Sequence, residues 1–365
     1  MNSLAIFGTI LLAASCLSNP LSRETRATCT LTGSSINDLS SIKQSCKSIT
    51  IQNLNVPAGQ TLDLTGLKSG TTVTFSGTIN FGVKEWEGPL ISISGSQIAV
   101  NGASGNKIVG GGPSYWDGQG GNGGKDKPKF FRAARLDHSV IRNINIYDSP
   151  VHVFSINRCQ NLTVDNVLID DSKGDSGGGH NTDAFDVGRS SQITIKNTRV
   201  YNQDDCLAVN SGTDIYFENN YCSGGHGISI GSVGGRDDNV VRNVVVRNCE
   251  VANSDNGIRI KTVYGATGSV SDITFQDITL TNINKYGVTI RGDYTNSGSK
   301  GTATDGVPIR NLVVRNVRGT IKSGGRRVMI LVKGASNWNW SGISLSGGKS
   351  ASDCSGIPSG SGAQC

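Results

Sequence analysis

The 365-residue sequence has few of the residues that mark helical or disordered proteins. Charged residues make up 17%, aromatic residues 6%, and there are 8 prolines and 2 methionines. So low a charged fraction argues against a disordered chain. Glycine is abundant, with 49 residues, and Val, Ile, Thr, Ser and Asn are frequent. This balance favours many short strands joined by tight turns, and the length suits one elongated domain.

The sequence also lacks an apolar run long enough to cross a bilayer. The run Leu4–Leu17 is interrupted by small residues and is followed by turn-forming ones, which is typical of a secretory signal peptide. We predict a signal peptide over residues 1–18, a short pro-segment over residues 19–26 and one domain over residues 27–365. The mature chain would start near Ala27 or Thr28, and the protein would be secreted and extracellular.

No two cysteines form a CxxC pair, which argues against a zinc site. An even number of cysteines after a signal peptide favours disulfides, and close spacing suggests Cys29–Cys46, Cys206–Cys222 and Cys354–Cys365. Cys159 and Cys249 are expected to be buried thiols. Asn161 and Asn339 begin acceptor motifs for N-glycosylation, in agreement with secretion.

The formal net charge of +6 allows two interpretations. One is an ordinary solvated basic surface. The other is attraction to a polyanion, with basic clusters at Lys125–Arg135 and at Arg326-Arg327. For a secreted protein the expected polyanion is an acidic polysaccharide, and neither a nucleic acid nor a membrane is an expected partner.

A sequence repeat predicts the architecture. One series of short apolar runs ends in Asn or Asp, at Asn143, Asn166, Asn197, Asn219, Asn248, Asp277 and Asn316. A second series interleaves with it, with apolar residues at Phe154, Phe185, Leu207, Ile228, Ile258, Val288 and Ile330. The basic period is about 22 residues, lengthened by insertions, as in a solenoid with one coil per repeat. Two strands per coil and no intervening helix predict an all-β, single-domain parallel β-helix. A β-propeller, with a period of about 40–50 residues, fits worse.

Two further structural features follow from the pattern. Ile36–Cys46 is the one plausible helix, because Ile36, Leu39 and Ile42 fall on one face, and it would cap the N-terminal end of the solenoid. The recurrent Asn residues are expected to stack in a ladder, either inside or at turns, where their side chains satisfy backbone groups.

The residues that carry chemistry form four clusters, each at or near the start of a strand: Asn181-Thr182-Asp183, Gln203-Asp204-Asp205, Gly225-His226-Gly227 and Arg259-Ile260-Lys261. Asp183, Asp205 and His226 each precede the apolar position of their coil by two residues. Since neighbouring strands lie about 4.7–4.9 Å apart, we expect these three side chains to form one column, with Asp204 pointing elsewhere. Arg259 and Lys261 share one face of the next coil.

Crowded carboxylates cannot all ionise easily, so repulsion raises at least one pKa and separates an acid from a base. Glycoside hydrolysis needs that separation, and the two cations could pair with carboxylates of a substrate. Each cluster alone could be a turn or a solvated strand face, and clustered carboxylates can also bind Ca²⁺. Because one repeat alignment brings all the groups to one surface, the catalytic interpretation is favoured.

The chain resembles glycoside hydrolase family 28, in particular its endopolygalacturonase members. The matching motifs are Asn181-Thr182-Asp183, Gln203-Asp204-Asp205-Cys206, Gly225-His226-Gly227-Ile228-Ser229, Arg259-Ile260-Lys261 and Gly292-Asp293-Tyr294. The resemblance implies a right-handed β-helix that hydrolyses α-1,4-linked galacturonan of pectin with inversion, inside the chain, during plant cell-wall degradation. It implies no metal or cofactor, a monomer, and plant inhibitor proteins as partners.

The resemblance also implies roles for single residues. Asp204 resembles the general acid that protonates the leaving oxygen, and His226 resembles the residue that tunes or shares its proton. Asp183 and Asp205 resemble the pair that activates the attacking water. The residues that resemble substrate binders are Arg259, Lys261, Tyr294 and Asn181.

One departure from the family pattern adds an alternative. Ala184 stands where the family usually has Gly, and its methyl group could crowd the water or tilt the carboxylate of Asp183. A pectin-binding protein without activity is therefore a competing hypothesis. A Ca²⁺-dependent pectate lyase, which would share the β-helix and the basic residues, is an alternative independent of Ala184, although the Asp-Asp and His arrangement argues against it.

Overall fold

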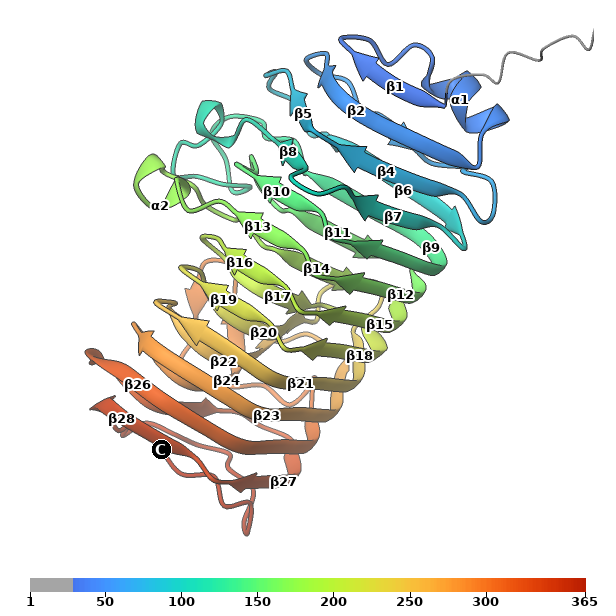
Figure 1. Ribbon diagram of the computed structural model, residues 1–365. Coiled ribbons are helices and arrows are strands. Elements are labelled where there is room, and N and C mark those ends of the chain that lie inside the picture. Colours follow the sequence, from blue (N-terminus) through green and yellow to red (C-terminus); the bar gives the residue numbers. More distant parts are fainter. Residues whose placement is uncertain (1–28) are drawn as a thin grey trace, which may run out of the picture.

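The protein is a single solenoid of parallel strands. The computed structural model describes residues 29–365, so the predicted signal peptide and pro-segment lie outside the described residues. Successive coils lie side by side along the molecule, from β1 at one end to β28 at the other (Figure 1). The prediction of a parallel β-helix is confirmed, but most coils carry three strands where the repeat predicted two.

The first face of the solenoid holds the strands of the second predicted series. It consists of β3 (Leu62–Leu64), β6 (Ile91–Ser96), the start of β9 (Phe131–Arg142), β11 (Phe154–Asn157), β14 (Phe185–Gly188), β17 (Asp205–Val209), β20 (Gly227–Val233), β22 (Asn256–Val263), β24 (Tyr286–Thr295) and the end of β26 (Ile309–Leu331). The expected alignment holds from Phe154 to Val288 and then fails. Val288 pairs with Val328, and Ile330 pairs with Ile290.

The second face carries the strands that lead to the recurrent Asn. It consists of β1 (Thr30–Gly33), β2 (Ser48–Val56), β4 (Thr72–Ser76), β7 (Ala99–Gly102), the end of β9, β12 (Gln160–Asp165), β15 (Ser190–Lys196), β18 (Gly212–Glu218), β21 (Val240–Ala252), β23 (Ser269–Ile283), the start of β26 and β27 (Ala335–Ser341).

The third face begins after those Asn residues. It consists of the end of β2, β5 (Thr78–Phe81), β8 (Lys107–Val109), β10 (Asn145–Tyr147), β13 (Leu168–Asp170), β16 (Arg199–Tyr201), β19 (Tyr221–Ser223), the later parts of β21, β23 and β26, and β28 (Ser344–Lys349). One short strand, β25 (Gly298–Ser299), pairs antiparallel with β24.

The bend between the second and third faces explains the recurrent Asn. Asn143 and Asn166 have φ of 60° and 52°, a left-handed conformation that Asn tolerates better than most residues. The side-chain amide of Asn166 donates to the side-chain oxygen of Asn143 at 2.8 Å. Asn316 donates in the same way to Asp277. Of the two ladders that the sequence allowed, the structure has the one at the turns.

The expected helix over Ile36–Cys46 is shorter in the structure, where α1 spans Leu39–Ser45. Leu39 and Ile42 are buried against the core, so the helix covers the N-terminal end of the coils. Two other short helical segments lie in loops beside the first face: η1 (Gly112–Ser114) and α2 (Gly174–Gly177).

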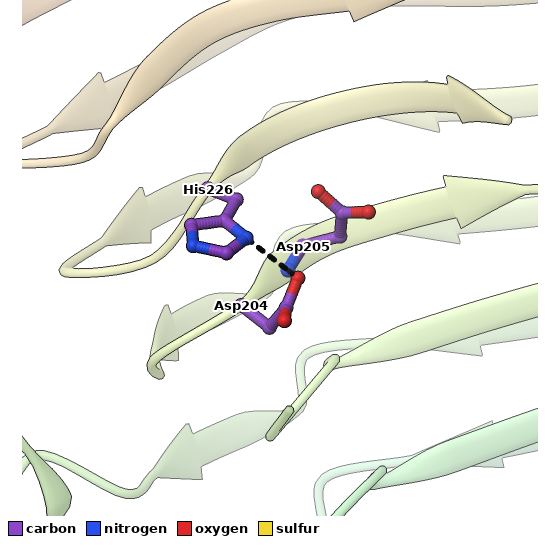
Figure 2. Close-up of side chains that lie close together, drawn as sticks. All are labelled: Asp204, Asp205 and His226. Carbon is purple, nitrogen blue, oxygen red and sulfur yellow. Dashed lines mark hydrogen bonds and ion pairs between the residues drawn. The ribbon is translucent and has the colours of Figure 1, made fainter. Parts of the chain in front are cut away.

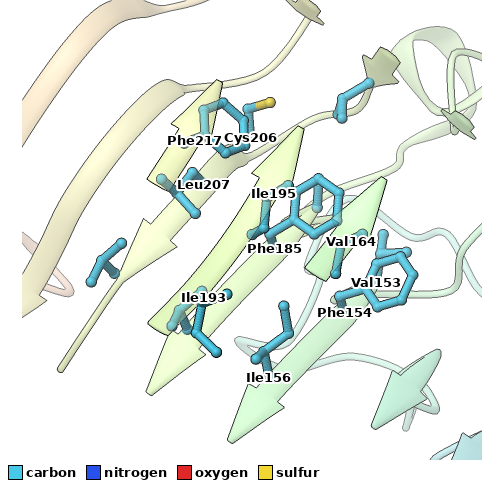
Figure 3. Close-up of a cluster of buried hydrophobic side chains, with 14 of the residues drawn as sticks. Val153, Phe154, Ile156, Val164, Phe185, Ile193, Ile195, Cys206, Leu207 and Phe217 are labelled. Carbon is cyan, nitrogen blue, oxygen red and sulfur yellow. The ribbon is translucent and has the colours of Figure 1, made fainter. Parts of the chain in front are cut away.

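A continuous apolar core fills the inside of the coils. Aromatic rings from neighbouring strands of the first face contact one another in it. The rings of Phe154 and Phe185 stack with centroids 5.3 Å apart (Figure 3). The rings of Phe131 and Phe154 are tilted, with centroids 4.9 Å apart. Such contacts fix the coils against one another, because the same position recurs on each strand. The outward residues of the first face are thereby held in register.

Within residues 29–365, three disulfides close loops: Cys29–Cys46, Cys206–Cys222 and Cys354–Cys365, the pairs that close spacing suggested. Cys159 and Cys249 are buried free thiols, and burial raises their pKa to about 11 and about 12. The side chains of Asn161 and Asn339 are exposed, and their glycosylation stays a prediction.

Candidate active site

A cleft of about 880 Å³ lies over the middle of the first face. Its lining includes every residue for which the sequence predicted a catalytic or substrate-binding role: Asn181, Asp183, Asp204, Asp205, His226, Arg259, Lys261 and Tyr294. The structure therefore brings together side chains from five successive strands, β14, β17, β20, β22 and β24, and from the turns that lead into them.

A shared backbone feature turns acids outward at two strand entries. On the coil of β14, Ala184 and Phe185 both lie in the core although they are consecutive. On the next coil Cys206 and Leu207 do the same. Two inward residues in a row break the strict alternation of a strand, so the acid before each pair faces the cleft. The methyl group of Ala184 is in the core and cannot crowd a water in the cleft.

Asp204 is held by three hydrogen bonds. Its Oδ1 lies 2.8 Å from Nδ1 of His226 and accepts the backbone N–H of Asp205 at 2.7 Å, and its Oδ2 accepts the side-chain amide of Asn181 at 2.8 Å. Figure 2 shows the His226 ring turned toward Asp204 while the carboxylate of Asp205 points away. The prediction that Asp204 and Asp205 point differently is confirmed.

The position of His226 corrects the predicted column. The sequence alignment put His226 beside Asp205, but Asp205 pairs with Gly227, and a register shift follows between Asp205 and Leu207. The backbone N–H of His226 donates to the carbonyl of Asp204 at 2.8 Å. Because Cys206 and Leu207 both enter the core, β17 has one residue more than its neighbour over this stretch, and His226 moves one position back.

Asp205 is an ion-pair centre. Its side chain is 1% exposed, its Oδ2 accepts Nζ of Lys261 at 2.8 Å, and its Oδ1 accepts the guanidinium of Arg259 and the hydroxyl of Ser229. Arg259 and Lys261 thus share one face, as predicted, but their nearest anion is in the protein. Lys261 also lies 5.2 Å from the ring centroid of Tyr294.

These contacts shift the pKa values of the site residues in opposite directions. Burial raises the pKa of Asp204, but the hydrogen bond and charge of His226, with the charges of Lys261 and Arg259, outweigh it and hold that pKa well below its usual range. For Asp205, Arg259 and Lys261 likewise outweigh burial and lower the pKa.

The pKa of Asp183 shifts in the opposite direction, because burial and the charges of Asp186, Asp204 and Asp205 raise it well above the ordinary value. Burial opposes a charge on His226, but the hydrogen bond and charge of Asp204 prevail and raise its pKa. In the free protein a proton therefore belongs on Asp183 or His226 before Asp204. The expectation that crowding raises at least one carboxyl pKa holds for Asp183.

Asn181 acts in the structure as a support for Asp204. Besides its bond to Asp204, its Oδ1 accepts the backbone N–H of Gly121 at 3.1 Å and the side-chain amide of Asn122 at 3.0 Å. It therefore fastens the loop before β9 to the acid. Its predicted contact with substrate stays a prediction.

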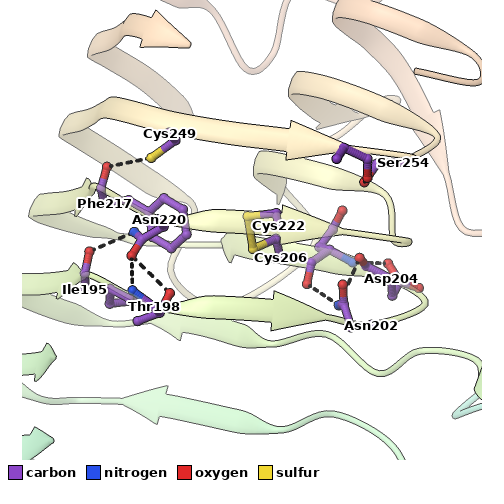
Figure 4. The surroundings of a disulfide bond; sticks show 12 residues. Ile195, Thr198, Asn202, Asp204, Cys206, Phe217, Asn220, Cys222, Cys249 and Ser254 are labelled. Carbon is purple, nitrogen blue, oxygen red and sulfur yellow. Dashed lines mark hydrogen bonds between the residues drawn. A yellow bond between two sulfur atoms is a disulfide. The ribbon is translucent and has the colours of Figure 1, made fainter. Parts of the chain in front are cut away.

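A buried amide and a disulfide support the same turn. Nδ2 of Asn202 donates to the carbonyls of Thr182 at 2.8 Å and Asp204 at 3.0 Å, which ties two neighbouring coils together below the acids. Cys206, directly after the acids, is bonded to Cys222 on the third face (Figure 4). Sequence reasoning did not single out Asn202.

Sequence reasoning also missed His152 and Asp186, which line the same cleft. His152 precedes the apolar position Phe154 by two residues, as Asp183 precedes Phe185. Asp186 directly follows Phe185 and lies in the outward row of β14, beside Ser155 of β11 and Ala208 of β17. Both would have been found by comparing the position two residues before Phe154 as well, and one further outward position on each strand.

The predicted basic cluster at Lys125–Arg135 is divided in the structure. Lys127 is buried and pairs with Asp117 at 2.9 Å. Lys129 and Arg132 are exposed and line a cavity of about 680 Å³ that borders the cleft. At the other cluster, Arg326 pairs with Asp353 at 3.0 Å and Arg327 donates to the carbonyl of Gly347.

Asp204, Asp205 and His226 offer ligand atoms within 4.8 Å of one another, the spacing of a metal site. The donors do not fit Ca²⁺, however. Both oxygens of Asp205 are occupied by Arg259 and Lys261, and these two cations would repel a third. The arrangement suits an anion that approaches the cations and a pair of acids that exchange protons.

A model of the glycosyl hydrolases family 28 matches residues 46–365. The chain belongs to this family. A polygalacturonase of Saccharomyces cerevisiae is 58% identical over 354 residues, which cover 97% of each chain. An endopolygalacturonase 1 of Colletotrichum lindemuthianum is 55% identical over 357 residues, again 97% of each chain.

A solved structure gives the same result for the fold. The endopolygalacturonase I of Stereum purpureum, determined in complex with two galacturonate, is 36% identical and superposes with a TM-score of 0.80. The match covers 90% of this chain and 99% of that one. Among residues 29–365, none of the helices has the length and apolar character needed to cross a membrane.

Proposed function

We propose that the protein is a polygalacturonase that hydrolyses α-1,4-galacturonosyl linkages of pectin and polygalacturonate. The observation that carries the proposal is the juxtaposition in one cleft of an acid–imidazole pair, a second carboxylate with a raised pKa and two largely buried cations. This set contains what a glycosidase for an anionic sugar needs: a proton donor, a base and a site for a carboxylate.

The cations bind the sugar at the cleavage site. Arg259 and Lys261 line the cleft while they pair with Asp205, and Tyr294 lies against Lys261. A galacturonate carboxylate that joins this cluster forms charge-assisted hydrogen bonds with cations already fixed in place. Asp205 keeps the two cations oriented, and because its oxygens are occupied it is the weaker candidate for the base.

Asp204, together with His226, donates the proton to the leaving oxygen. In the free site the positive charges of His226, Lys261 and Arg259 keep Asp204 ionised. A galacturonate carboxylate beside Lys261 and Arg259 cancels part of this effect, so substrate binding favours transfer of the proton from His226 to Asp204. Asp204 is then protonated, and so able to donate, when the glycosidic oxygen is in place.

Asp183 activates the attacking water. It belongs to the coil before Asp204, and its Oδ1 accepts no hydrogen bond from the described residues. An inverting enzyme needs a water between base and acid, which are then about 6.5–9.5 Å apart. The placement of Asp183 and of the Asp204–His226 pair on different coils supports inversion.

The shape of the cleft supports cleavage inside a polymer. The cavity that holds Lys129 and Arg132 shares His152, Ser155 and Asn157 with the cleft, so the groove continues past the acids over earlier coils. A long polyanion can lie along it with its carboxylates near Lys129 and Arg132. Secretion, a monomeric state, and inhibition by plant proteins belong to the same proposal.

The proposal is tested with polygalacturonate. The wild-type protein should release reducing ends, lower the viscosity early, and give the β-anomer first in proton NMR. Asp204→Asn should fold normally, as judged by circular dichroism, and lose about 10²–10⁴-fold in kcat. Asp137→Asn is a matched control, because Asp137 also pairs with a histidine, His138 at 2.8 Å, outside the cleft.

The other outcomes identify the competing functions. Binding of polygalacturonate by the wild type without reducing ends would mean a binding protein. A product that absorbs in the ultraviolet and requires Ca²⁺ would mean a lyase. Near-normal turnover by Asp204→Asn would overturn the assignment of the acid.

A further inference from the structure

A second imidazole–carboxylate group lies in the cleft, on the two coils that precede the proposed acid. Nε2 of His152 is 3.7 Å from Oδ1 of Asp183, and Nδ1 of His152 is 4.0 Å from Oδ2 of Asp186. The ring is thus within ion-pair range of one acid on each side. At these distances a protonated ring interacts with both carboxylates directly or through a bridging water.

The surroundings of Asp183 disfavour a negative charge on its carboxylate. Asp186, Asp204 and Asp205 all face it with negative charge, and its own Oδ1 is buried without a hydrogen bond. The positive charge of Lys261, which is paired with Asp205, offsets part of this repulsion. The cation that His152 can supply is on the opposite side, 3.7 Å from the same unpaired oxygen. A positive charge on the His152 ring therefore stabilises an ionised Asp183 from this side.

The ring has a defined place. His152 leads into β11, whose Phe154 stacks on Phe185 in the core, and the side chain of His152 is 29% exposed. Gly121 of the loop fastened by Asn181 approaches the ring, since a Cβ there would meet ring atoms at 3.9 Å. The two cavities that His152 lines also contain Lys129 and Arg132 from the preceding coil, Asp183 and Asp186 from the following coil, and His180 from the loop between. Further charged groups line them on both sides: Glu87, Lys125, Asp126 and Lys127 in the cavity over the earlier coils, and Arg189, Asp204, Asp205, His226, Arg236, Asp237, Asp238, Arg259 and Lys261 in the cleft.

We infer that His152 is a positioning residue for the proposed base: its imidazolium holds Asp183 ionised and oriented toward the water, and Asp186 holds the other ring nitrogen. The inference rests on the proposed function, in which Asp183 activates water. In this arrangement the site has a histidine at each end. His226 serves the acid on one side and His152 serves the base on the other.

Two substitutions should act in opposite directions. His152→Gln removes a cation beside Asp183, so the acidic limb of kcat against pH should move to higher pH by about 1 unit or more. Asp186→Asn removes a negative neighbour of Asp183, so the acidic limb should move to lower pH. KM should change less than kcat in both, and His152→Lys, which keeps a cation, should restore part of the wild-type profile.

The matched control is His138→Gln, because His138 also pairs with an acid, Asp137, but is exposed outside the cleft. Its pH profile should coincide with that of the wild type. Should His152→Gln be too slow to assay, carbon NMR of labelled aspartate carboxyls, with Asp183→Asn to assign the signal, follows the titration of Asp183 without turnover.

Each result decides one of the two proposals. Equal acidic limbs for wild type and His152→Gln, or an unshifted Asp183 signal, would overturn the role of His152. A shift in the same direction for His152→Gln and Asp186→Asn would do so as well. A wild-type protein that releases no reducing ends would instead overturn the proposed function, while the NMR titration would still report on His152 and Asp183.

Discussion

His226 is paired with Asp204, at 2.8 Å between Nδ1 and Oδ1, and not with the neighbouring Asp205. The pair raises the pKa of His226 and keeps that of Asp204 low, so the two groups carry one proton, which belongs to His226 in the free protein. The proposed proton donor is therefore a pair. It loses its proton when the pH rises through the raised pKa of His226.

Substitution of His226 should show this in the pH dependence of turnover. In His226→Gln the remaining acid is Asp204, whose ordinary pKa is lower than that of histidine. We expect kcat on polygalacturonate to fall about 10²-fold and the alkaline limb to move to lower pH. Initial rates of reducing-end release from pH 3 to 9 measure both, on the wild-type and variant proteins. An alkaline limb that stays in place would exclude His226 as the carrier of the proton.

Asp205 should be needed for stability as well as for binding. Its side chain is almost fully buried and neutralises Arg259 and Lys261. Removing one partner of a buried ion pair costs about 3–5 kcal/mol, because the other charge stays buried without compensation. Asp205→Asn should lower the free energy of unfolding in urea by roughly 3 kcal/mol. The double variant Asp205→Asn, Lys261→Met should recover part of the lost free energy of unfolding. If Asp205→Asn alone lost less than about 1 kcal/mol, Arg259 and Lys261 would have to reach solvent in the variant.

The repeat carried enough information for the fold. Apolar positions such as Phe154 and Phe185 recur because each coil places one side chain in the same core layer. Asn143 and Asn166 recur because the bend between two faces needs a left-handed residue. Both features are local rules that each coil repeats, so a single sequence shows them.

The candidate site was predicted less completely than the fold, because its geometry depends on details of single strands. Strict alternation placed His226 beside Asp205, but Cys206 and Leu207 both enter the core and shift the register by one residue. That shift depends on how a strand entry packs, which periodicity does not contain. His152 and Asp186 were missed because the position two residues before the apolar one was compared only from Phe185 onward, and because only one outward position per strand was considered.

A buried carboxyl outside the cleft should make stability depend on pH. Asp171 is fully buried, its Oδ1 accepts the backbone N–H of Ser149 at 2.6 Å, and burial raises its pKa to about 8. Since the folded-state pKa is above the unfolded one, this group's contribution is complete below about pH 4 and is lost as pH rises through about 8.

Asp171→Asn, which is neutral at every pH and keeps the acceptor, should remove this dependence. The Tm of the variant relative to wild type should therefore be more favourable at pH 8 than at pH 4, by the equivalent of a few kcal/mol. Calorimetry across this range measures it, with Asp137→Asn as an exposed control. A constant difference in Tm would mean that Asp171 is ionised in the folded protein, compensated by groups other than Ser149.

Ala184, directly after the proposed base Asp183, should matter for core packing and not for catalysis. Its methyl group is fully buried in the core, while its backbone N–H donates to the carbonyl of Asp205 at 2.9 Å. Ala184→Gly should leave kcat within about twofold, because nothing changes in the cleft. It should lower the free energy of unfolding by about 1 kcal/mol, through greater freedom of the unfolded chain and loss of a buried methyl group. Urea unfolding and reducing-end assays on the same preparation measure the two quantities. A large rise in kcat with glycine would mean that the methyl group tilts Asp183 through the backbone, and the geometry of the base would then depend on a core contact.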